Sequence, residues 1–298
     1  MACDYRLRQG RHLGLKIRVG HSPDPDDAFM FYAIAKEKIP TDGQQIEHVV
    51  EDIESLNTRA FRSELEVTAL SCHAFGLVSD RYQLLPYGAS VGDNYGPIVV
   101  ASKNRPRPDS IAKARIAVPG RYTTAYLALQ LYEKNFKPIF TPFDQIFSAV
   151  QKGDADFGLL IHEGQLTYQE MGFEKIVDLG EWWFKECGLP LPLGINAIRR
   201  DLDENQKVTF TQVFLRSIEY AMKHREEALR YALQFGRGID TKRGNRFVGM
   251  YVNDYSLDFG EKGLRALKFL FERSLDKGLL PSPVKIEVLS LPLIKSGS

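Results

Sequence analysis

The stretch KIRVGHSPDPDDAFMFYAIA, residues 16–35, decides the fold. Its first five residues alternate polar and apolar side chains, which predicts a strand, and its last eight are rich in apolar residues. Between them, Asp24 is a preferred helix N-cap and Pro25 suits the first helical position. Asp26 and Asp27 complement the positive end of a helix dipole. The stretch therefore predicts a strand, a tight turn and a helix over residues 16–38.

The same alternation of strands and helices continues along the chain. In the first part we expect strands at 45–50, 66–71 and 96–102 and a helix at 53–63. A polar, proline-punctuated stretch at 103–110 interrupts the pattern, and a second α/β unit follows over 111–180. Its expected elements are strands at 115–119, 137–142 and 156–161 and helices at 123–136 and 143–152. A crossing strand at 189–198 then leads to helices at 206–234 and 262–277.

This order predicts an α/β protein of two lobes, each a mostly parallel sheet flanked by helices. We expect an N-terminal arm at 1–15, a first lobe formed by 16–102 and 195–298, and a second lobe, 103–194, inserted into the first. Ligands of open α/β sheets bind beyond the carboxyl ends of the strands. The ligand cleft is therefore expected between the two lobes.

Composition and charge argue against nucleic acids and membranes as partners of this protein. The 298 residues contain 39 Lys and Arg against 38 Asp and Glu, a formal net charge of +1 that indicates neither nucleic acid nor an anionic membrane as a partner. No apolar run approaches the ~18 residues of a membrane helix. The charged first twenty residues do not resemble a secretory signal, and the three cysteines suit a reducing compartment. We expect a cytoplasmic monomer or homodimer that binds a small molecule.

The turn at Ser22 is the first candidate site. Ser22 offers a hydroxyl group and the turn offers backbone donors, while the nearby aspartates disfavour an anion and favour a neutral, hydroxyl-bearing group. A capped turn with solvated carboxylates is the structural alternative. No carboxylate cluster elsewhere completes a hard-metal site, so no metal is expected.

Ser71 follows the third expected strand and is a candidate for a polar ligand contact. Ser71 and His73 could also form a nucleophile and its base, but no GxSxG motif surrounds Ser71, so a hydrolase is not favoured.

The segment PGRYTTA, residues 119–125, is a candidate anion site. Gly120 permits close approach of a ligand to the backbone, and Thr123 can cap the helix that follows. Thr124 and Ala125 then present backbone N–H groups at a helix start that carries no acid. A plain capped helix is the alternative.

The segment GLLIHEGQ, residues 158–165, carries the candidate base. An apolar strand ends at His162, and histidine is the side chain whose unperturbed pKa of ~6.5 suits proton transfer at neutral pH. A histidine with a structural role is the alternative. We expect His162 to face the cleft opposite the anion site.

Four segments together resemble the 1,4-dihydroxy-6-naphthoate synthases of the futalosine route to menaquinone. They are SPDPDDAFMFY at 22–32, VPGRYTTA at 118–125, LIHEGQ at 160–165 and LPLPLG at 189–194. The resemblance implies a type II periplasmic-binding-protein-like fold, which the chorismate dehydratases of that route share. The IHEG segment is what separates the two groups.

By this resemblance His162 is the catalytic base, Ser71, Thr123 and Thr124 contact the substrate, and the Ser22 turn lines the cleft. The implied reaction cleaves cyclic dehypoxanthinylfutalosine, an anionic aromatic metabolite, to 1,4-dihydroxy-6-naphthoate without a cofactor. A non-catalytic solute-binding protein and a chorismate dehydratase are the alternatives. The family pattern at the first turn usually reads SPCPNDT. Here Asp24 replaces the cysteine, Asp26 the asparagine and Ala28 the threonine, which is consistent with a divergent branch acting on a related molecule.

Overall fold

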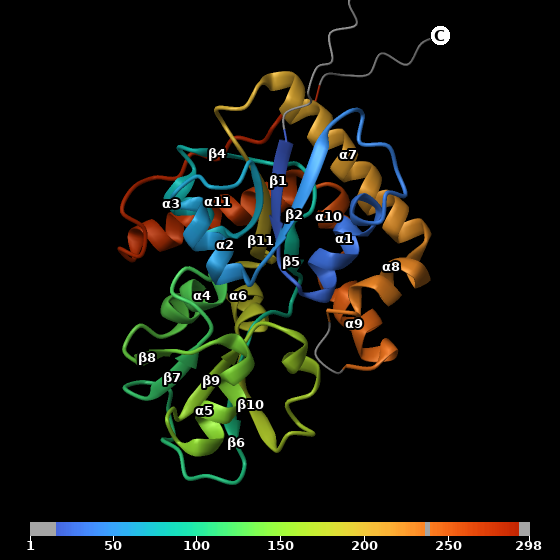
Figure 1. Cartoon of the computed structure of the whole chain (residues 1–298). Coiled ribbons are helices and arrows are strands. Elements are labelled where there is room, and N and C mark those ends of the chain that lie inside the picture. Colours follow the sequence, from blue (N-terminus) through green and yellow to red (C-terminus); the bar gives the residue numbers. More distant parts are fainter. Residues whose placement is uncertain (1–15, 236–238, 292–298) are drawn as a thin grey trace, which may run out of the picture.

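The computed structural model describes residues 16–235 and 239–291, and within them the chain forms two lobes, each built on one sheet (Figure 1). The N-terminal arm expected at 1–15 lies outside the described residues. The alternation of strands and helices in the sequence is thus realised as a two-lobe α/β architecture.

The sheet of the first lobe has six strands in the order β2-β1-β3-β11-β4, and β5 pairs with β11. The strands are β1 (Lys16–His21), β2 (Gln45–Val50), β3 (Val67–Ser71), β4 (Tyr82–Leu84), β5 (Ser90–Gly92) and β11 (Leu191–Arg199). The helices associated with it are α1 (Pro25–Ala35), α2 (Ile53–Ala60), α3 (Cys72–Val78), α7 (Glu204–Lys223), α8 (Arg225–Ala232), α9 (Thr241–Tyr251), α10 (Asp254–Leu257) and α11 (Gly260–Asp276).

The sheet of the second lobe has five strands in the order β10-β6-β9-β7-β8. They are β6 (Ile98–Ser102), β7 (Arg115–Val118), β8 (Lys137–Phe140), β9 (Phe157–Leu160) and β10 (Phe173–Asp178). The helices that follow these strands are α4 (Thr124–Tyr132), α5 (Ile146–Lys152) and α6 (Leu179–Cys187), with short 3-10 turns η1 (Phe143–Gln145) and η2 (Glu163–Leu166).

The predicted strands and helices occur close to their expected positions, with two differences. The helix expected at 206–234 is divided at His224 into α7 and α8. Both sheets are mixed rather than mostly parallel: β1 runs parallel to β2 and β3, whereas β11 runs antiparallel to β3. In the second lobe, β7 is parallel to both its neighbours and β6 is antiparallel to both of its own. The antiparallel pairs involve the strands that follow the crossings between lobes.

The pairing of the strands also changes the residues at which the chain passes from one lobe to the other. The strand Ile98–Ser102, expected to end the first lobe, pairs with β9 and β10 in the second sheet. Strand β11, which brings the chain back to the first lobe, joins the first sheet from Leu191, which pairs with Gly92. The chain therefore passes between the sheets before Ile98 and again before Leu191. The prediction that β6 belongs to the first lobe was wrong, because the sequence of an apolar strand does not indicate which sheet the strand joins.

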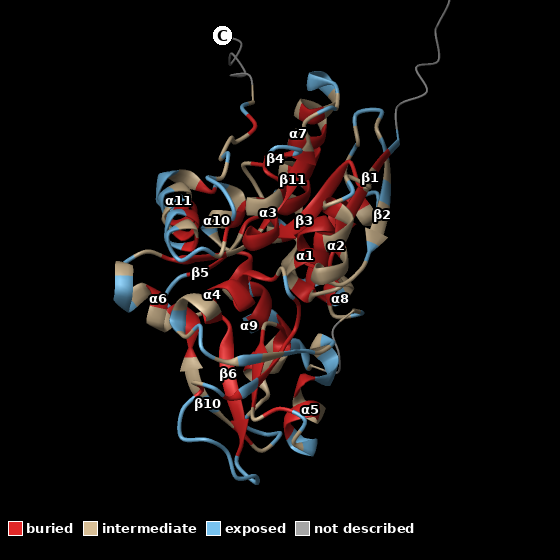
Figure 2. Ribbon diagram, turned by 90° about the vertical axis from the view of Figure 1, so that its left-hand side faces the viewer, coloured by how far each residue is buried: buried red, intermediate tan, exposed pale blue. Residues whose placement is uncertain are grey.

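Helix α1 is buried on all sides, which fixes the turn that precedes it. Phe29, Met30 and Phe31 are fully buried. The Phe31 ring stacks between the rings of His21 and Phe214, at centroid distances of 4.7 and 4.6 Å. Figure 2 shows the buried residues running through both sheets and the helices against them. Such packing holds the turn between β1 and α1 in one position.

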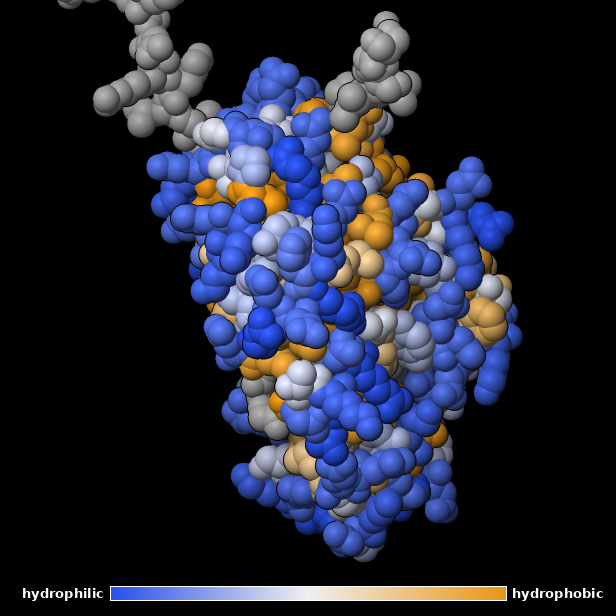
Figure 3. All heavy atoms as spheres, turned by 90° about the vertical axis from the view of Figure 1, so that its right-hand side faces the viewer, coloured by the Kyte–Doolittle hydropathy of each residue, from blue (hydrophilic) through white to orange (hydrophobic). Residues whose placement is uncertain are grey.

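The face seen in Figure 3 is mainly hydrophilic, with hydrophobic residues in smaller groups. Among the described residues, no helix combines the length and apolar character that crossing a bilayer requires.

Candidate active site between the lobes

A cavity of about 100 Å³ lies between the two lobes. The first lobe contributes the turn after β1, the end of β3 and part of β11, and the second contributes the start of α4 and the residues after β9. Among the predicted site residues, the following line this one cavity: Ser22, Ser71, Thr123, Thr124, Ala125 and His162. Within the described chain, Gly120 is the predicted site residue that does not line it.

The Ser22 turn is held by its own polar groups. The Ser22 hydroxyl donates to Oδ2 of Asp24 at 3.0 Å and accepts from the Asp24 backbone N–H at 3.1 Å. The Ser22 N–H donates to Oδ2 of Asp27 at 2.9 Å. Asp24 is the N-cap of α1, as the sequence predicts, but its side chain makes no capping hydrogen bond. The Asp24 carboxylate therefore contacts the Ser22 hydroxyl rather than an N–H group in the first turn of its own helix.

Two further aspartates on α1 line the cavity, and their environment reduces their charge. Burial, with the neighbouring carboxylates, raises the pKa of Asp26 well above its usual value. Burial also raises the pKa of Asp27 to about 6. Since a raised pKa favours the neutral carboxylic acid, this side of the cavity is less anionic than the count of three aspartates suggests.

Ser71 faces the cavity from the end of β3, and Asn57 of α2 fixes its orientation. The Asn57 side chain accepts from the Ser71 N–H at 3.0 Å and donates to the Ser71 hydroxyl at 3.1 Å. Asn57 is fully buried. The sequence analysis missed Asn57, because a polar residue in an amphipathic helix gives no signal until its partner is known. Burial lowers the pKa of His73 to about 4, which suits a neutral structural histidine.

The start of α4 lies on the opposite side. Thr123 is its N-cap, with Oγ1 accepting from the Tyr126 N–H at 3.2 Å. The Thr124 hydroxyl donates to the carbonyl of Leu193 in β11 at 2.5 Å and accepts from the His73 N–H at 3.3 Å. Thr124 therefore links the two lobes. The first N–H groups of a helix lack intrahelical partners, so this end of the cavity suits an anionic group.

Gly120 occupies a different position from the one expected. A Cβ atom on Gly120 would lie 2.5 Å from Cδ of Glu54, a residue of α2. The Glu54 carboxylate accepts from the backbone N–H groups of Arg121 at 2.7 Å and Tyr122 at 3.1 Å. The loop from 120 to 122, predicted to bind the ligand's anion, thus binds a carboxylate of the protein itself. Burial raises the pKa of Glu54, although these backbone hydrogen bonds oppose the shift.

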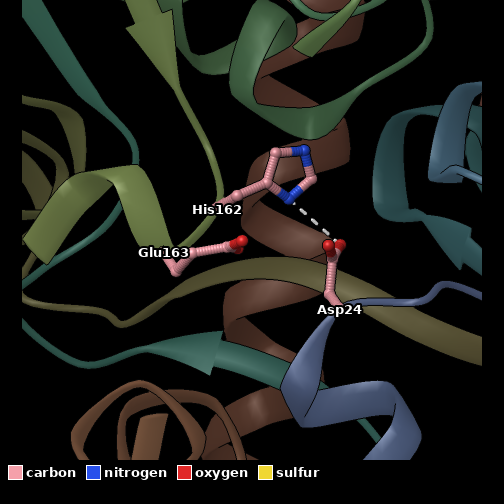
Figure 4. Close-up of side chains that lie close together, drawn as sticks. All are labelled: Asp24, His162 and Glu163. Carbon is pink, nitrogen blue, oxygen red and sulfur yellow. Dashed lines mark ion pairs between the residues drawn. The ribbon is translucent and has the colours of Figure 1, made fainter. Parts of the chain in front are cut away.

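His162 follows β9 and points toward the first lobe (Figure 4). Its Nδ1 lies 3.0 Å from Oδ2 of Asp24, and both side chains are nearly buried, with exposed fractions of 11% and 13%. The Phe143 ring meets the imidazole edge-on at a centroid distance of 4.3 Å. The base predicted from the second lobe therefore lies in the same cavity as the start of α4, paired with an acid of the first lobe.

Asp24, His162 and Glu163 form a cluster in which one ligand-type atom from each lies within 4.8 Å of the others. Carboxylate oxygens and imidazole nitrogens are donors that divalent cations accept. The 3.0 Å separation of Nδ1 and Oδ2 is, however, a direct contact between acid and imidazole that needs no ion to explain it. The cluster is accordingly described as a carboxylate–histidine pair with Glu163 beside it.

Helix α9 also reaches the cavity, which the sequence did not indicate. The Tyr251 hydroxyl donates to Oε1 of Gln165 in the second lobe at 3.1 Å, and both residues line the cavity. Gln165 belongs to the LIHEGQ segment, but no pattern in the sequence links it with α9. This contact adds another connection between the lobes.

Comparisons with known proteins indicate the family of the chain. A family model described as menaquinone biosynthesis matches residues 17–275. The chain is 41% identical over 268 residues to a 1,4-dihydroxy-6-naphthoate synthase of Thermus thermophilus, covering 90% of this chain and 97% of that protein. It is 32% identical over 273 residues to the protein of the same name from Streptomyces coelicolor, covering 89% and 95% of the two chains.

Solved structures support the same assignment of fold. The crystal structure of protein AF1704 from Archaeoglobus fulgidus has a TM-score of 0.84 at 51% identity, covering 89% of this chain and 98% of that one. The alkanesulfonate-binding protein SsuA from Xanthomonas axonopodis has a TM-score of 0.69 at 11% identity, covering 90% and 95%, and shows the periplasmic-binding-protein-like fold alone. With its two lobes, the cleft between them and a family model that spans most of its length, the chain belongs to the menaquinone biosynthesis family.

Proposed function

We propose that the chain is a carbon–carbon lyase that converts cyclic dehypoxanthinylfutalosine to 1,4-dihydroxy-6-naphthoate, with His162 as the general base. The observation that carries the proposal is that His162 and the N-terminal turn of α4 line the same cavity. The names of the relatives from Thermus thermophilus and Streptomyces coelicolor supply the product. Because those relatives are biosynthetic enzymes, the cytoplasm is the proposed compartment.

The two sides of the cavity suit the two ends of such a substrate. The start of α4 carries no acid in its first turn, so its N–H groups favour the carboxylate of the aromatic part. The turn after β1 carries three aspartates and the Ser22 hydroxyl, which favours the neutral, hydroxyl-bearing sugar-derived part. This orientation places the two parts of the substrate against different lobes, with His162 between them.

In the proposed reaction, His162 takes one proton from the substrate. A carbon–carbon bond to the sugar-derived part then breaks, and formation of the aromatic ring drives the step. The electron pair of the broken bond stays with one fragment, and protonated His162 returns its proton to the products. One molecule is thus split into two without net oxidation, so no redox partner is required. A positioned base contributes ~10²–10⁴-fold, and orientation in a cavity shielded from water contributes further.

The experiment is a direct assay of purified protein with cyclic dehypoxanthinylfutalosine, with the product followed by chromatography. We expect wild-type protein to form 1,4-dihydroxy-6-naphthoate and His162→Gln to lose ~10²-fold or more in kcat while still binding the product by calorimetry. Wild-type protein that binds the product but converts no substrate would identify a solute-binding protein instead. Turnover of chorismate in its place would identify a chorismate dehydratase.

A further inference from the structure

We propose that Asp24 is a positioning residue for His162, holding the imidazole with its proton on Nδ1 so that Nε2 is the atom that accepts the substrate's proton. The proposal rests on the function proposed above and assigns a role to a residue at which this chain departs from the usual family pattern, which has cysteine at this position. The contact that carries it is the 3.0 Å separation between His162 Nδ1 and Asp24 Oδ2.

The Asp24 carboxylate gives up a local interaction to make this contact. An aspartate at an N-cap normally accepts a hydrogen bond from an N–H group in the first turn of its helix. Asp24 has the backbone conformation of an N-cap, with φ −65° and ψ 146°, but makes no such bond. Figure 4 shows its carboxylate directed at the His162 ring. Helix α1 thus starts without a side-chain cap, while the carboxylate faces a histidine of the other lobe.

The orientation of Asp24 is fixed from its own side. The Ser22 hydroxyl donates to Oδ2, the same oxygen that faces His162, at 3.0 Å. Pro23 and Pro25 flank Asp24 and restrict the backbone on both sides. The turn also precedes a helix that is buried on all sides. Because the Asp24 carboxylate is fixed in this way, it can restrict the orientation of the His162 ring that it contacts.

The orientation of His162 is limited from the other side. The Phe143 ring packs edge-on against the imidazole at a centroid distance of 4.3 Å, so the imidazole contacts Phe143 as well as Asp24. Figure 4 shows the second ring nitrogen on the side of the ring away from Asp24. In the described structure, neither ring nitrogen makes a hydrogen bond of good geometry, so the contact with Asp24 is close but not aligned. Catalytic hydrogen bonds are often poorly aligned without substrate and tighten when it binds.

The consequence for the reaction follows from charge. His162 carries a positive charge once it has accepted the proton, and the Asp24 carboxylate lies 3.0 Å from its Nδ1. Glu163 lies in the same cluster and adds to the negative field, but Asp24 is the acid that contacts the ring directly. Asp24 lines the cavity, but its proposed effect on the proton transfer is exerted through His162.

The first test is kinetic and uses Asp24→Asn, with Asp80→Asn as the matched control because Asp80 is exposed and lies outside the cavity. An asparagine side chain has the same size but no charge, and its amide can present either oxygen or NH2 to the ring. We expect Asp24→Asn to lower kcat by ~10- to 100-fold and to change KM by less than about threefold. Equal kcat values in Asp24→Asn and Asp80→Asn would overturn the proposal.

The second test is spectroscopic and does not depend on turnover. Protein labelled with ¹⁵N-histidine reports the tautomer of each imidazole, and loss of one signal in His162→Gln assigns His162. We expect the Nδ1–H tautomer in wild-type protein and a mixture with Nε2–H in Asp24→Asn. A wild-type His162 in the Nε2–H form would overturn the proposal even if Asp24→Asn failed to fold. If the lyase reaction itself is absent, this result still decides the Asp24–His162 pairing.

A third test distinguishes a direct contact between Asp24 and His162 from a metal site formed by Asp24, His162 and Glu163. Wild-type protein is dialysed against EDTA and assayed, then assayed again with added Zn²⁺ or Mn²⁺. Unchanged activity after dialysis supports the direct pairing of Asp24 with His162. Loss of activity that either cation restores would instead assign Asp24, His162 and Glu163 as metal ligands and overturn the proposal.

Discussion

Glu54 accepts a hydrogen bond from the backbone N–H of Arg121 at 2.7 Å, so a carboxylate of the first lobe occupies a loop of the second. The same carboxylate accepts from the Tyr122 N–H, and Gly120 provides the space next to it. Thr124 and Tyr251 make the other hydrogen bonds between the lobes described above. The lobes are thus joined around the cavity by a small set of polar contacts that can be tested one at a time.

The first prediction concerns the space at Gly120. Gly120→Ala would bring a methyl group to 2.5 Å from Cδ and Oε2 of Glu54. We expect a loss of ~1–3 kcal/mol in the free energy of unfolding, measured in urea, because the Glu54 side chain must move. In the Glu54→Ala background the same change should cost much less, giving a measurable coupling energy.

The control for this cycle is Gly249→Ala. A Cβ atom there would lie 3.5 Å from its nearest neighbour, Nη2 of Arg225, and alanine is favoured over glycine inside a helix. We expect no loss of stability at this position. Equal costs of Gly120→Ala with and without the Glu54 carboxylate would contradict the arrangement described here.

The second prediction concerns closure of the lobes. Glu54→Ala removes the acceptor of the Arg121 and Tyr122 N–H groups, so we expect an arrangement with the two lobes further apart to become more populated. We expect KM to rise by ~10-fold, which is about 1.4 kcal/mol, and the radius of gyration in X-ray scattering to increase. A variant with unchanged scattering and unchanged KM would show that this contact does not hold the lobes together.

The third prediction concerns Asn57, which orients Ser71. Asn57→Ala leaves the buried Ser71 N–H without its acceptor, and such a loss costs ~1–3 kcal/mol of stability. We also expect weaker substrate binding, because the Ser71 hydroxyl in the cavity loses its donor. Urea unfolding and KM measure the two effects, and a variant with wild-type values for both would rule out this role.

The fourth prediction concerns the pH dependence of stability. Burial and the neighbouring His48 lower the pKa of His21 to about 4, while an unfolded histidine titrates near ~6.5. Between these values the unfolded state binds more protons, so the histidine destabilises the folded state as pH falls. We expect the stability advantage of wild-type protein over His21→Gln to shrink by roughly 3 kcal/mol between pH 7 and pH 4.

Comparing the unfolding free energies of wild-type protein and His21→Gln at each pH removes the contribution of Asp27, which changes with pH in the opposite direction. Burial raises the pKa of Asp27 to about 6, so that carboxyl stabilises the folded state relative to the unfolded state as pH falls. The carboxyl is present in both proteins and its contribution cancels. A difference in unfolding free energy that stays constant over this pH range would contradict the assignment of His21 as a neutral buried histidine.

The sequence by itself determined the local elements and the sides of the cavity. The alternation at 16–20 forms β1, and the proline-braced aspartates start α1 where predicted. The apolar strand before His162 and the threonines at 123 and 124 likewise occupy the strand end and helix start expected of them. These features depend on periodicity and capping within a few residues, which neighbouring side chains encode.

Only the tertiary structure decided which of these residues meet. Asp24 was predicted to cap its own helix, yet it faces His162 of the other lobe. Gly120 was predicted to approach a ligand, yet it makes room for Glu54. The membership of β6 in the second sheet was decided in the same way. Such contacts join residues far apart in the chain, so they depend on how two packed lobes approach each other, and no local pattern records that geometry.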